Sequence, residues 1–134
     1  MTHIISHQFD INPVPAARPR VSRWSTYYPK KYTRFKKEME ALTGQLDTTP
    51  CESLVVVSLR FKIKIPQSWS KKKRLERENT YCNNNSDIDN YIKAMLDSLN
   101  GVYFIDDRQV VEVFASKKYS NKPRILFTMM KIGE

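Results

Sequence analysis

Carboxylates gather in two short segments that lie close together in the second half of the chain. The first, "SDIDN", places Asp87 and Asp89 one residue apart, and the second, "IDDRQ", contains the adjacent pair Asp106 and Asp107. Carboxylate oxygens are the ligands that hard divalent cations such as Mg²⁺ prefer in proteins. Three or four carboxylates brought together would repel one another unless a cation or protons compensated them. The two segments are therefore candidates for a metal site.

Helix capping is the alternative interpretation of the first segment. Ser86 followed three residues later by Asp89 fits a capping box, and an aspartate near a helix N-terminus offsets the macrodipole. Capping accounts for Ser86 and one aspartate but does not require Asp87. In a regular helix the two carboxylates would diverge by about 200°, so a shared ion requires an extended backbone at Asp87, at or before the cap. The residues alone leave both interpretations open.

A helix should follow, because apolar side chains recur at three- and four-residue spacing up to "NG". These are Ile88, Tyr91, Ile92, Met95, Leu96 and Leu99. Lys93 and Asp97 then share a helix face with Asp89, at four-residue steps. Lys93 either supports the transition state of a phosphodiester hydrolysis or forms an ordinary salt bridge with Asp89 or Asp97. The short turn after the helix allows Asp106 to return beside it.

The charge distribution favours a polyanionic partner. The net charge is +9, with eight basic residues between positions 18 and 37, five more between 71 and 77, and six of the 14 acids between 87 and 112. A basic body with one acidic island is expected of an enzyme that acts on a polyanion, or of a generic basic surface with an acidic helix end. A carboxylate-bound Mg²⁺ in such a protein indicates phosphodiester hydrolysis.

The remaining sequence predicts a single domain, residues 1–134, of the α/β or α+β class, with helices packed on one mixed β-sheet. Alternating residues predict strands at 3–11, 53–66, 109–120 and 123–132, the last two joined by a hairpin at 121–123. Helical spacing predicts a helix at 30–46 and a shorter, basic helix at 68–79. Three prolines make residues 12–29 an extended loop.

Localisation is expected to be cytoplasmic. Cys51 and Cys82 do not form a CxxC motif, and two cysteines are too few for a disulfide framework. The apolar runs are too short to span a membrane. The first ten residues, "MTHIISHQFD", lack the basic and apolar regions of a signal peptide.

The stretch "DIDNYIKAMLDSLNG" followed by "FIDDRQVVE" resembles the RusA family of Holliday junction resolvases, the crossover junction endodeoxyribonucleases of bacteria and their phages. The family pattern is D-x-D-N-x-x-K-x-x-x-D, a short Gly-containing connection, and then D-D-x-Q-V. The resemblance implies a RusA-like fold and a homodimeric, structure-selective endonuclease that resolves four-way DNA junctions by paired symmetric nicks, in recombination and repair. It also implies Mg²⁺ as cofactor, with Mn²⁺ able to replace it, in a bacterial cell.

The resemblance also assigns residues by position. Metal ligands are Asp87, Asp89 and Asp107, and the catalytic set adds the acidic neighbour Asp106 and the lysine Lys93. The stretch "PVPAARPRVSRWSTYYPKKYTRFKKEM" is similar to the family's Arg-Pro-Arg and Tyr-x-Pro-Lys region. Side chains expected to contact DNA phosphates are Arg18, Arg20, Lys30, Lys31, Lys117 and Lys118. The run Asn83–Asn85 departs from the family, which often has a basic residue or proline directly before the first aspartate.

Three aromatic residues in this region, Trp24, Tyr27 and Tyr28, have two interpretations. They either lie near splayed bases at the crossover or form an aromatic cluster that pins the Pro-rich loop to the protein body. For the chain as a whole, the alternative to a resolvase is a non-catalytic junction- or DNA-binding protein in which the acids only cap helices. A related nuclease that prefers flaps or RNA is a third possibility.

Overall fold

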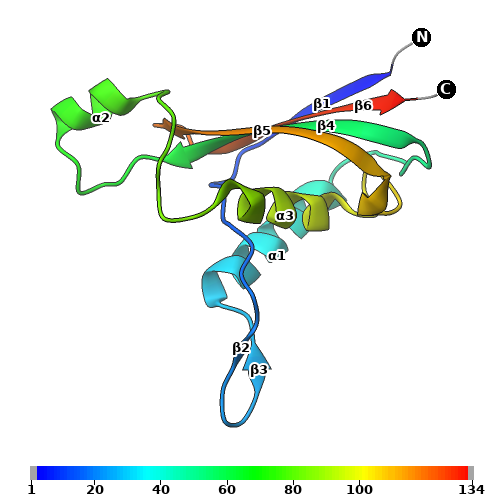
Figure 1. Ribbon diagram of the computed structural model, residues 1–134, viewed down its shortest axis with the longest axis horizontal. Helices are drawn as coiled ribbons and strands as arrows, with labels where there is room; N and C mark the ends of the chain where they lie inside the picture. Colours follow the sequence, from blue (N-terminus) through cyan, green and yellow to red (C-terminus); the bar gives the residue numbers. More distant parts are fainter. Residues whose placement is uncertain (1–2, 133–134) are drawn as a thin grey trace. The chain divides into compact units, whose positions relative to one another are not determined.

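The computed structural model describes residues 3–132, which form two compact units (Figure 1). The sheet unit consists of residues 3–13, 53–85 and 108–132, and the helical unit consists of residues 14–52 and 86–107. The chain enters each unit more than once, so neither is a simple continuous segment of the sequence.

The sheet unit is built on a mixed four-stranded sheet. Its strands are β1 (Ile4–Phe9), β4 (Leu54–Lys64), β5 (Val110–Ser120) and β6 (Arg124–Ile132), in the order β1-β6-β4-β5. Strand β4 pairs in parallel with β5 and antiparallel with β6, and β6 pairs antiparallel with β1. Alternate side chains of β4 are buried, as the apolar and polar alternation in its sequence predicts: Val55, Val57, Leu59, Phe61 and Ile63.

The predicted hairpin between the last two strands is wrong. A tight turn does connect them, closed by the bond from Arg124 Nη1 to the carbonyl oxygen of Lys122 at 2.7 Å. However, β4 lies between β5 and β6 in the sheet and pairs with both. Strand β4, whose alternate side chains are buried, therefore takes an interior position in the sheet. The short connection from β5 to β6 crosses from one side of β4 to the other.

Helix α2 (Lys71–Arg77) also belongs to the sheet unit. The hydroxyl of Ser70 caps it by accepting a hydrogen bond from the amide N–H of Lys73 at 3.2 Å. The short basic helix predicted from the sequence is present, and none of its residues is buried. A short 3₁₀ helix, η1 (Asp107–Gln109), leads directly into β5.

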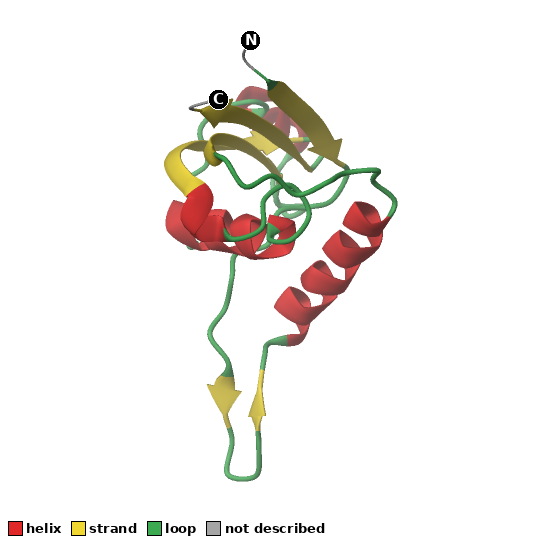
Figure 2. Ribbon diagram, turned by 90° about the vertical axis from the view of Figure 1, so that its right-hand side faces the viewer, coloured by secondary structure: helices red, strands yellow, loops and turns green. Residues whose placement is uncertain are grey.

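The helical unit contains α1 (Lys30–Gly44) and α3 (Ile88–Leu99). The buried residues of α1 are Tyr32, Phe35 and Met39. In α3, Tyr91, Met95 and Leu99 of the predicted apolar stripe are buried together with Ala94, whereas Ile88, Ile92 and Leu96 are half-buried. Within the predicted extended loop, two short strands, β2 (Arg20–Val21) and β3 (Thr26–Tyr27), form a hairpin that the sequence did not predict (Figure 2).

These elements confirm the predicted α+β class, with a mixed sheet of four strands and three α-helices. The single domain over residues 1–134 stays a prediction. Among residues 3–132, no helix is long and apolar enough to cross a membrane.

Candidate active site

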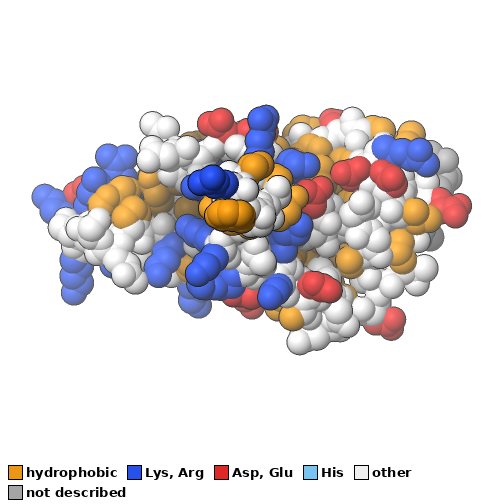
Figure 3. All heavy atoms as spheres, turned by 90° about the horizontal axis from the view of Figure 1, so that it is seen from below, with side chains coloured by type: hydrophobic (Ala, Val, Ile, Leu, Met, Phe, Trp, Pro, Cys, Tyr) orange, Lys and Arg blue, Asp and Glu red, His pale blue; other side chains and the backbone are white. Residues whose placement is uncertain are grey.

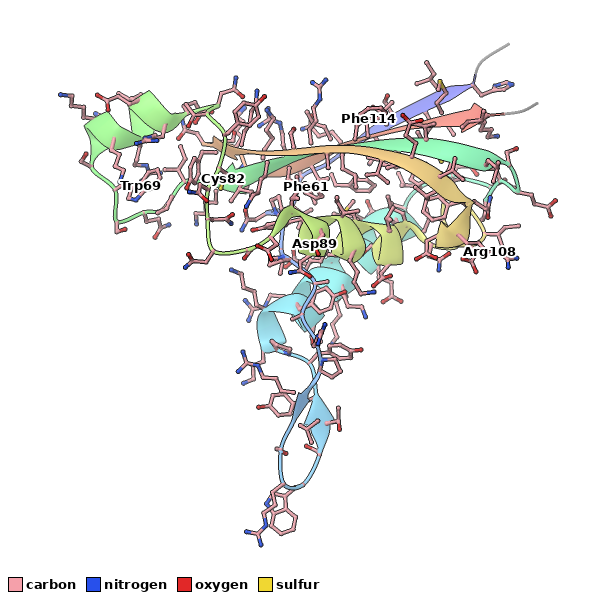
Figure 4. The ribbon with its side chains drawn as sticks, in the orientation of Figure 1. Phe61, Trp69, Cys82, Asp89, Arg108 and Phe114 are labelled. Atoms are coloured by element: carbon pink, nitrogen blue, oxygen red, sulfur yellow. The ribbon has the colours of Figure 1, made fainter. Side chains whose placement is uncertain are left out.

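Two of the predicted metal ligands lie at the start of α3. Asp87 occupies the N-cap position with an extended backbone (φ −73°, ψ 146°), and its side chain makes no capping hydrogen bond. Asp89 lies in the first turn (Figure 4), and both aspartates are exposed. The N-cap is thus Asp87 and not Ser86, so the capping box does not describe this helix start. Asp87 has the extended conformation that a shared ion would require.

Lys93 and Asp97 follow on the exposed face of α3. The Nζ atom of Lys93 lies 3.5 Å from Oδ2 of Asp97, an i, i+4 ion pair in which the lysine side chain remains 67% exposed. The structure therefore contains the salt bridge to Asp97 that the spacing predicts. Because an exposed pair of this kind stabilises a helix by only about 0.3 to 0.5 kcal/mol, the ammonium group of Lys93 stays available to a ligand.

The loop after α3 is held firmly enough to position the second acidic pair. Gly101 has a positive φ of 82°, which favours glycine, and its amide N–H donates to the carbonyl oxygen of Phe104 at 2.7 Å. Tyr103 and Phe104 are buried. Cys51 pairs with this loop from the other side, donating to Tyr103 at 3.0 Å and accepting from Ile105 at 3.3 Å. The chain therefore returns to Asp106 and Asp107 by a fixed path.

The electrostatics of Asp107 involve two charged residues of α3. Its pKa is raised, first by partial burial, then by a side-chain hydrogen bond with Asp106 and by the negative charges of Asp106 and Asp97. The positive charge of Lys93 partly opposes these effects. The predicted return of the acidic pair to the helix stays a prediction. Negative charges dominate around Asp107, and a proton or a bound cation would reduce their repulsion.

The donor types fit a hard divalent cation, but the predicted ligands do not form one cluster. Across residues 3–132, no three or more His, Cys, Asp or Glu side chains come together in a way that could hold a metal ion. The assignment of Asp87, Asp89 and Asp107 as ligands thus stays a prediction.

Tyr32 of α1 is a candidate site residue that the sequence did not single out for chemistry. It is buried, but its pKa is raised by burial and then by the charge of Asp97 and by Tyr28, which places the phenol near the acidic face of α3. The Nζ atom of Lys36 lies 5.3 Å from the ring centroid of Tyr32 and 5.2 Å from that of Tyr28. The four-residue step from Tyr32 to Lys36 was the only sequence signal for this arrangement.

The predicted phosphate contacts of the helical unit are all exposed: Arg18, Arg20, Lys30 and Lys31. The segment that carries the two arginines begins beside α3, because the amide N–H of Ala16 donates to the carbonyl oxygen of Asn90 at 2.8 Å. Figure 3 shows basic and apolar side chains next to one another where the β2–β3 hairpin faces the viewer.

The aromatic residues of this segment do not form a cluster that pins the loop. Trp24 is 87% exposed, Tyr27 50% and Tyr28 46%. Tyr28 does contact the helix, with its ring centroid 6.0 Å from that of Tyr32. For Trp24 the pinning interpretation is wrong, because a side chain that holds a loop in place has to be buried against something.

The other two predicted DNA contacts, Lys117 and Lys118, are half-buried on β5 in the sheet unit. The Nζ atom of Lys117 donates to Oδ1 of Asn84 at 2.7 Å. That of Lys118 lies 4.8 Å from the ring centroid of Tyr81. One member of the asparagine run thus has a structural role, which is to hold a lysine of β5.

Comparison with known proteins identifies the family to which this chain belongs. The family model for the endodeoxyribonuclease RusA matches residues 10–130. The chain belongs to the RusA family of Holliday junction resolvases, as the motif around Asp87 and Asp107 predicts. The uncharacterized protein YqaN of Bacillus subtilis (strain 168) is 31% identical over 122 residues, which cover 84% of this chain and 86% of YqaN.

Proposed function

We propose that this protein is a metal-dependent, structure-selective endodeoxyribonuclease that resolves four-way DNA junctions. The observation that carries the proposal is the exposed face of α3. Asp87 at its N-cap, Asp89 and Lys93 are exposed, and the pKa of Asp107 is raised by burial, by Asp106 and by the charge of Asp97 on the same helix. Exposed carboxylates that repel one another, within a basic protein, suit the binding of a cation and a phosphate together.

The residues would divide the work as follows. Asp87, Asp89 and Asp107 would hold Mg²⁺, or Mn²⁺ in its place. When bound, the ion would activate a water molecule and neutralise charge on the scissile phosphate. Lys93 lies between Asp89 and Asp97 along α3 and would donate to a non-bridging phosphate oxygen. Asp97 would orient Lys93 through the ion pair.

Bringing all three ligands to one ion would require movement of side chains or of the loop that carries Asp106 and Asp107. Within residues 3–132 no three His, Cys, Asp or Glu side chains come together in a way that could hold a metal ion, which sets this requirement. Movement is consistent with the raised pKa of Asp107, because the mutual repulsion that raises it is relieved when a cation arrives. Resolution by paired nicks would further need two active sites, which a two-fold symmetric homodimer supplies.

A labelled synthetic four-way junction tests the proposal. With Mg²⁺ the protein should produce symmetric nicks, and Asp87→Asn and Asp107→Asn should each abolish them. Asp47→Asn, which changes an exposed aspartate outside α3, is the matched control and should cut normally.

Two results would contradict the proposal. Unchanged cleavage by Asp87→Asn and Asp107→Asn would overturn the site assignment. Tight junction binding with no cleavage at any metal concentration would favour the non-catalytic DNA-binding alternative. Linear duplex, flap and RNA substrates assayed in parallel would show whether the junction is the preferred substrate.

A further inference from the structure

The β2–β3 hairpin exposes large apolar side chains within a segment that contains no acid. Trp24 is 87% exposed and Val21 is 81% exposed. Residues 11–37 contain eight lysines and arginines and no aspartate or glutamate. An exposed tryptophan contributes little to folding, because the hydrophobic effect requires burial. Its place at the tip of a basic hairpin therefore indicates a ligand that combines negative charge with a flat apolar surface.

The tip of the hairpin is an ordered turn. Ser22 donates its amide N–H to the carbonyl oxygen of Ser25 at 2.7 Å, and its hydroxyl oxygen accepts from the amides of Ser25 at 3.0 Å and Trp24 at 3.3 Å. Among non-glycine residues in 3–132, only Asn79 has a positive φ, so the tip does not use the turn types that favour tight hairpins. The hydrogen bonds to the Ser22 hydroxyl stabilise the turn instead, and they fix the backbone that carries Trp24.

Arg23 adds a cation at the same tip. Its Cζ atom lies 5.4 Å from the centroid of the Trp24 ring, so the guanidinium group and the indole form one composite surface. Arg20 lies on β2, opposite Tyr27 of β3, and both are exposed. Aromatic side chains interleaved with basic ones are the surface on which proteins stack unpaired bases while contacting the flanking phosphates.

We propose that this hairpin recognises DNA branch points by stacking Trp24 on an unpaired or unstacked base, with Arg20 and Arg23 on neighbouring phosphates. The inference rests on the proposed function in that DNA is taken as the ligand. Bases inside a continuous duplex are covered on both faces by their neighbours, whereas a branch uncovers at least one face. Trp24 therefore selects for DNA structure and not for sequence, since every base has a π face.

The hairpin is tethered close to the acidic residues. Ala16 is hydrogen-bonded to Asn90 in the first turn of α3, and the eight residues from Ala16 to Trp24 span at most about 26 Å at about 3.3 Å per residue. That reach corresponds to no more than about eight base-pair steps of about 3.4 Å. The stacked base should accordingly lie within about eight base pairs of the bond cut at Asp87 and Asp89.

Fluorescence and binding measurements on the full chain, without divalent metal, test this role. The chain has two tryptophans, so Trp69→Phe leaves Trp24 as the only one. A four-way junction should quench its emission, and a linear duplex of the same arm sequence should not. Trp24→Ala should weaken junction binding about tenfold or more and duplex binding less than twofold, while Trp24→Phe should retain most of the junction affinity. Leu75→Ala, which removes an exposed apolar side chain from the basic helix α2, should change neither affinity.

The same titrations contain the results that would overturn the proposal. Unchanged junction affinity in Trp24→Ala would do so, and so would equal losses on junction and duplex. Anionic phosphatidylserine vesicles that quench Trp24 as strongly as the junction does would identify the hairpin as a membrane contact. Because no metal is present, the outcome is independent of DNA cleavage. If the wild type never cuts DNA but Trp24→Ala still loses junction selectivity, the role of the hairpin stands and the proposed nuclease function fails.

Discussion

The amide N–H of Ala16 donates to the carbonyl oxygen of Asn90 at 2.8 Å, which ties the Pro-rich segment to the first turn of α3. Arg18 follows Ala16 by two residues, and Asp89 directly precedes Asn90. The strongest basic segment of the chain therefore starts beside the first acidic pair. A metal ion with a phosphate would complement both the aspartates and the basic segment.

Asp107→Asn should raise the thermal stability of the metal-free protein at neutral pH. The folded-state pKa of Asp107 is raised, which means that folding favours the protonated carboxyl group. The stabilisation from this protonated form is fully present below the unfolded pKa and is lost as the pH rises through the folded pKa. The variant should consequently gain roughly 0.2 to 1 kcal/mol at pH 7, the scale of surface charge interactions, and this gain should vanish in acid. Thermal unfolding from pH 3 to pH 7 measures it.

If Asp107 is a ligand, added Mg²⁺ should make the wild type more stable than Asp107→Asn. Wild type should then gain stability with metal concentration, while Asp107→Asn should gain less. Asp47→Asn serves as the control and should follow wild type throughout. A wild-type protein more stable than Asp107→Asn without metal at pH 7 would contradict the repulsion that raises the Asp107 pKa.

Lys93→Met should separate catalysis from helix stability. Loss of the exposed ion pair with Asp97 should cost only about 0.3 to 0.5 kcal/mol of the free energy of unfolding. Loss of a positively charged donor at the phosphate should lower the junction cleavage rate about 100-fold or more. Single-turnover cleavage and urea unfolding of the same preparation provide the two numbers.

Asp97→Asn is the matched variant, because it breaks the same ion pair and leaves the ammonium group in place. Its cleavage rate should fall less than that of Lys93→Met. Equal losses in the two variants would assign Lys93 a structural role only.

Gly101→Ala and Gly44→Ala should change stability in opposite directions. Gly101 has a φ of 82°, and an added Cβ would meet no atom within 4 Å, so the cost is conformational, about 1 to 2 kcal/mol. Gly44 ends α1 and is equally open, so alanine there should add up to about 1 kcal/mol through higher helix propensity. Chemical denaturation measures both. A neutral effect of Gly101→Ala would show that the turn can adopt another conformation.

Asn84→Ala should lower the free energy of unfolding by about 1 kcal/mol, because it removes the acceptor for the Nζ atom of Lys117 at 2.7 Å. Asn85→Ala, at an exposed neighbouring position, should change stability by less than about 0.5 kcal/mol. Urea denaturation compares the two variants. If they prove equally stable, the asparagine run does not support β5 through Asn84.

Much of the local structure could be read from the sequence. The 3.6-residue spacing around Met95 and the alternation around Val57 identified α3 and β4, because burial on one face imposes these periods on the chain. The motif from Asp87 to Gln109 identified the RusA family. The need for an extended backbone at Asp87 also followed from the sequence, since it depends only on helix geometry at one point.

Tertiary structure decided the features that depend on residues far apart in the chain. The interior position of β4 between β5 and β6 could not be read from a turn that suits a hairpin, because strand order is set by which partners bury the sheet. The approach of Tyr32 to Asp97 arises from the packing of α1 and α3. The exposure of Trp24 was likewise undetermined, because an aromatic residue in a Pro-rich loop has the same sequence signature whether it is buried or presented to a ligand.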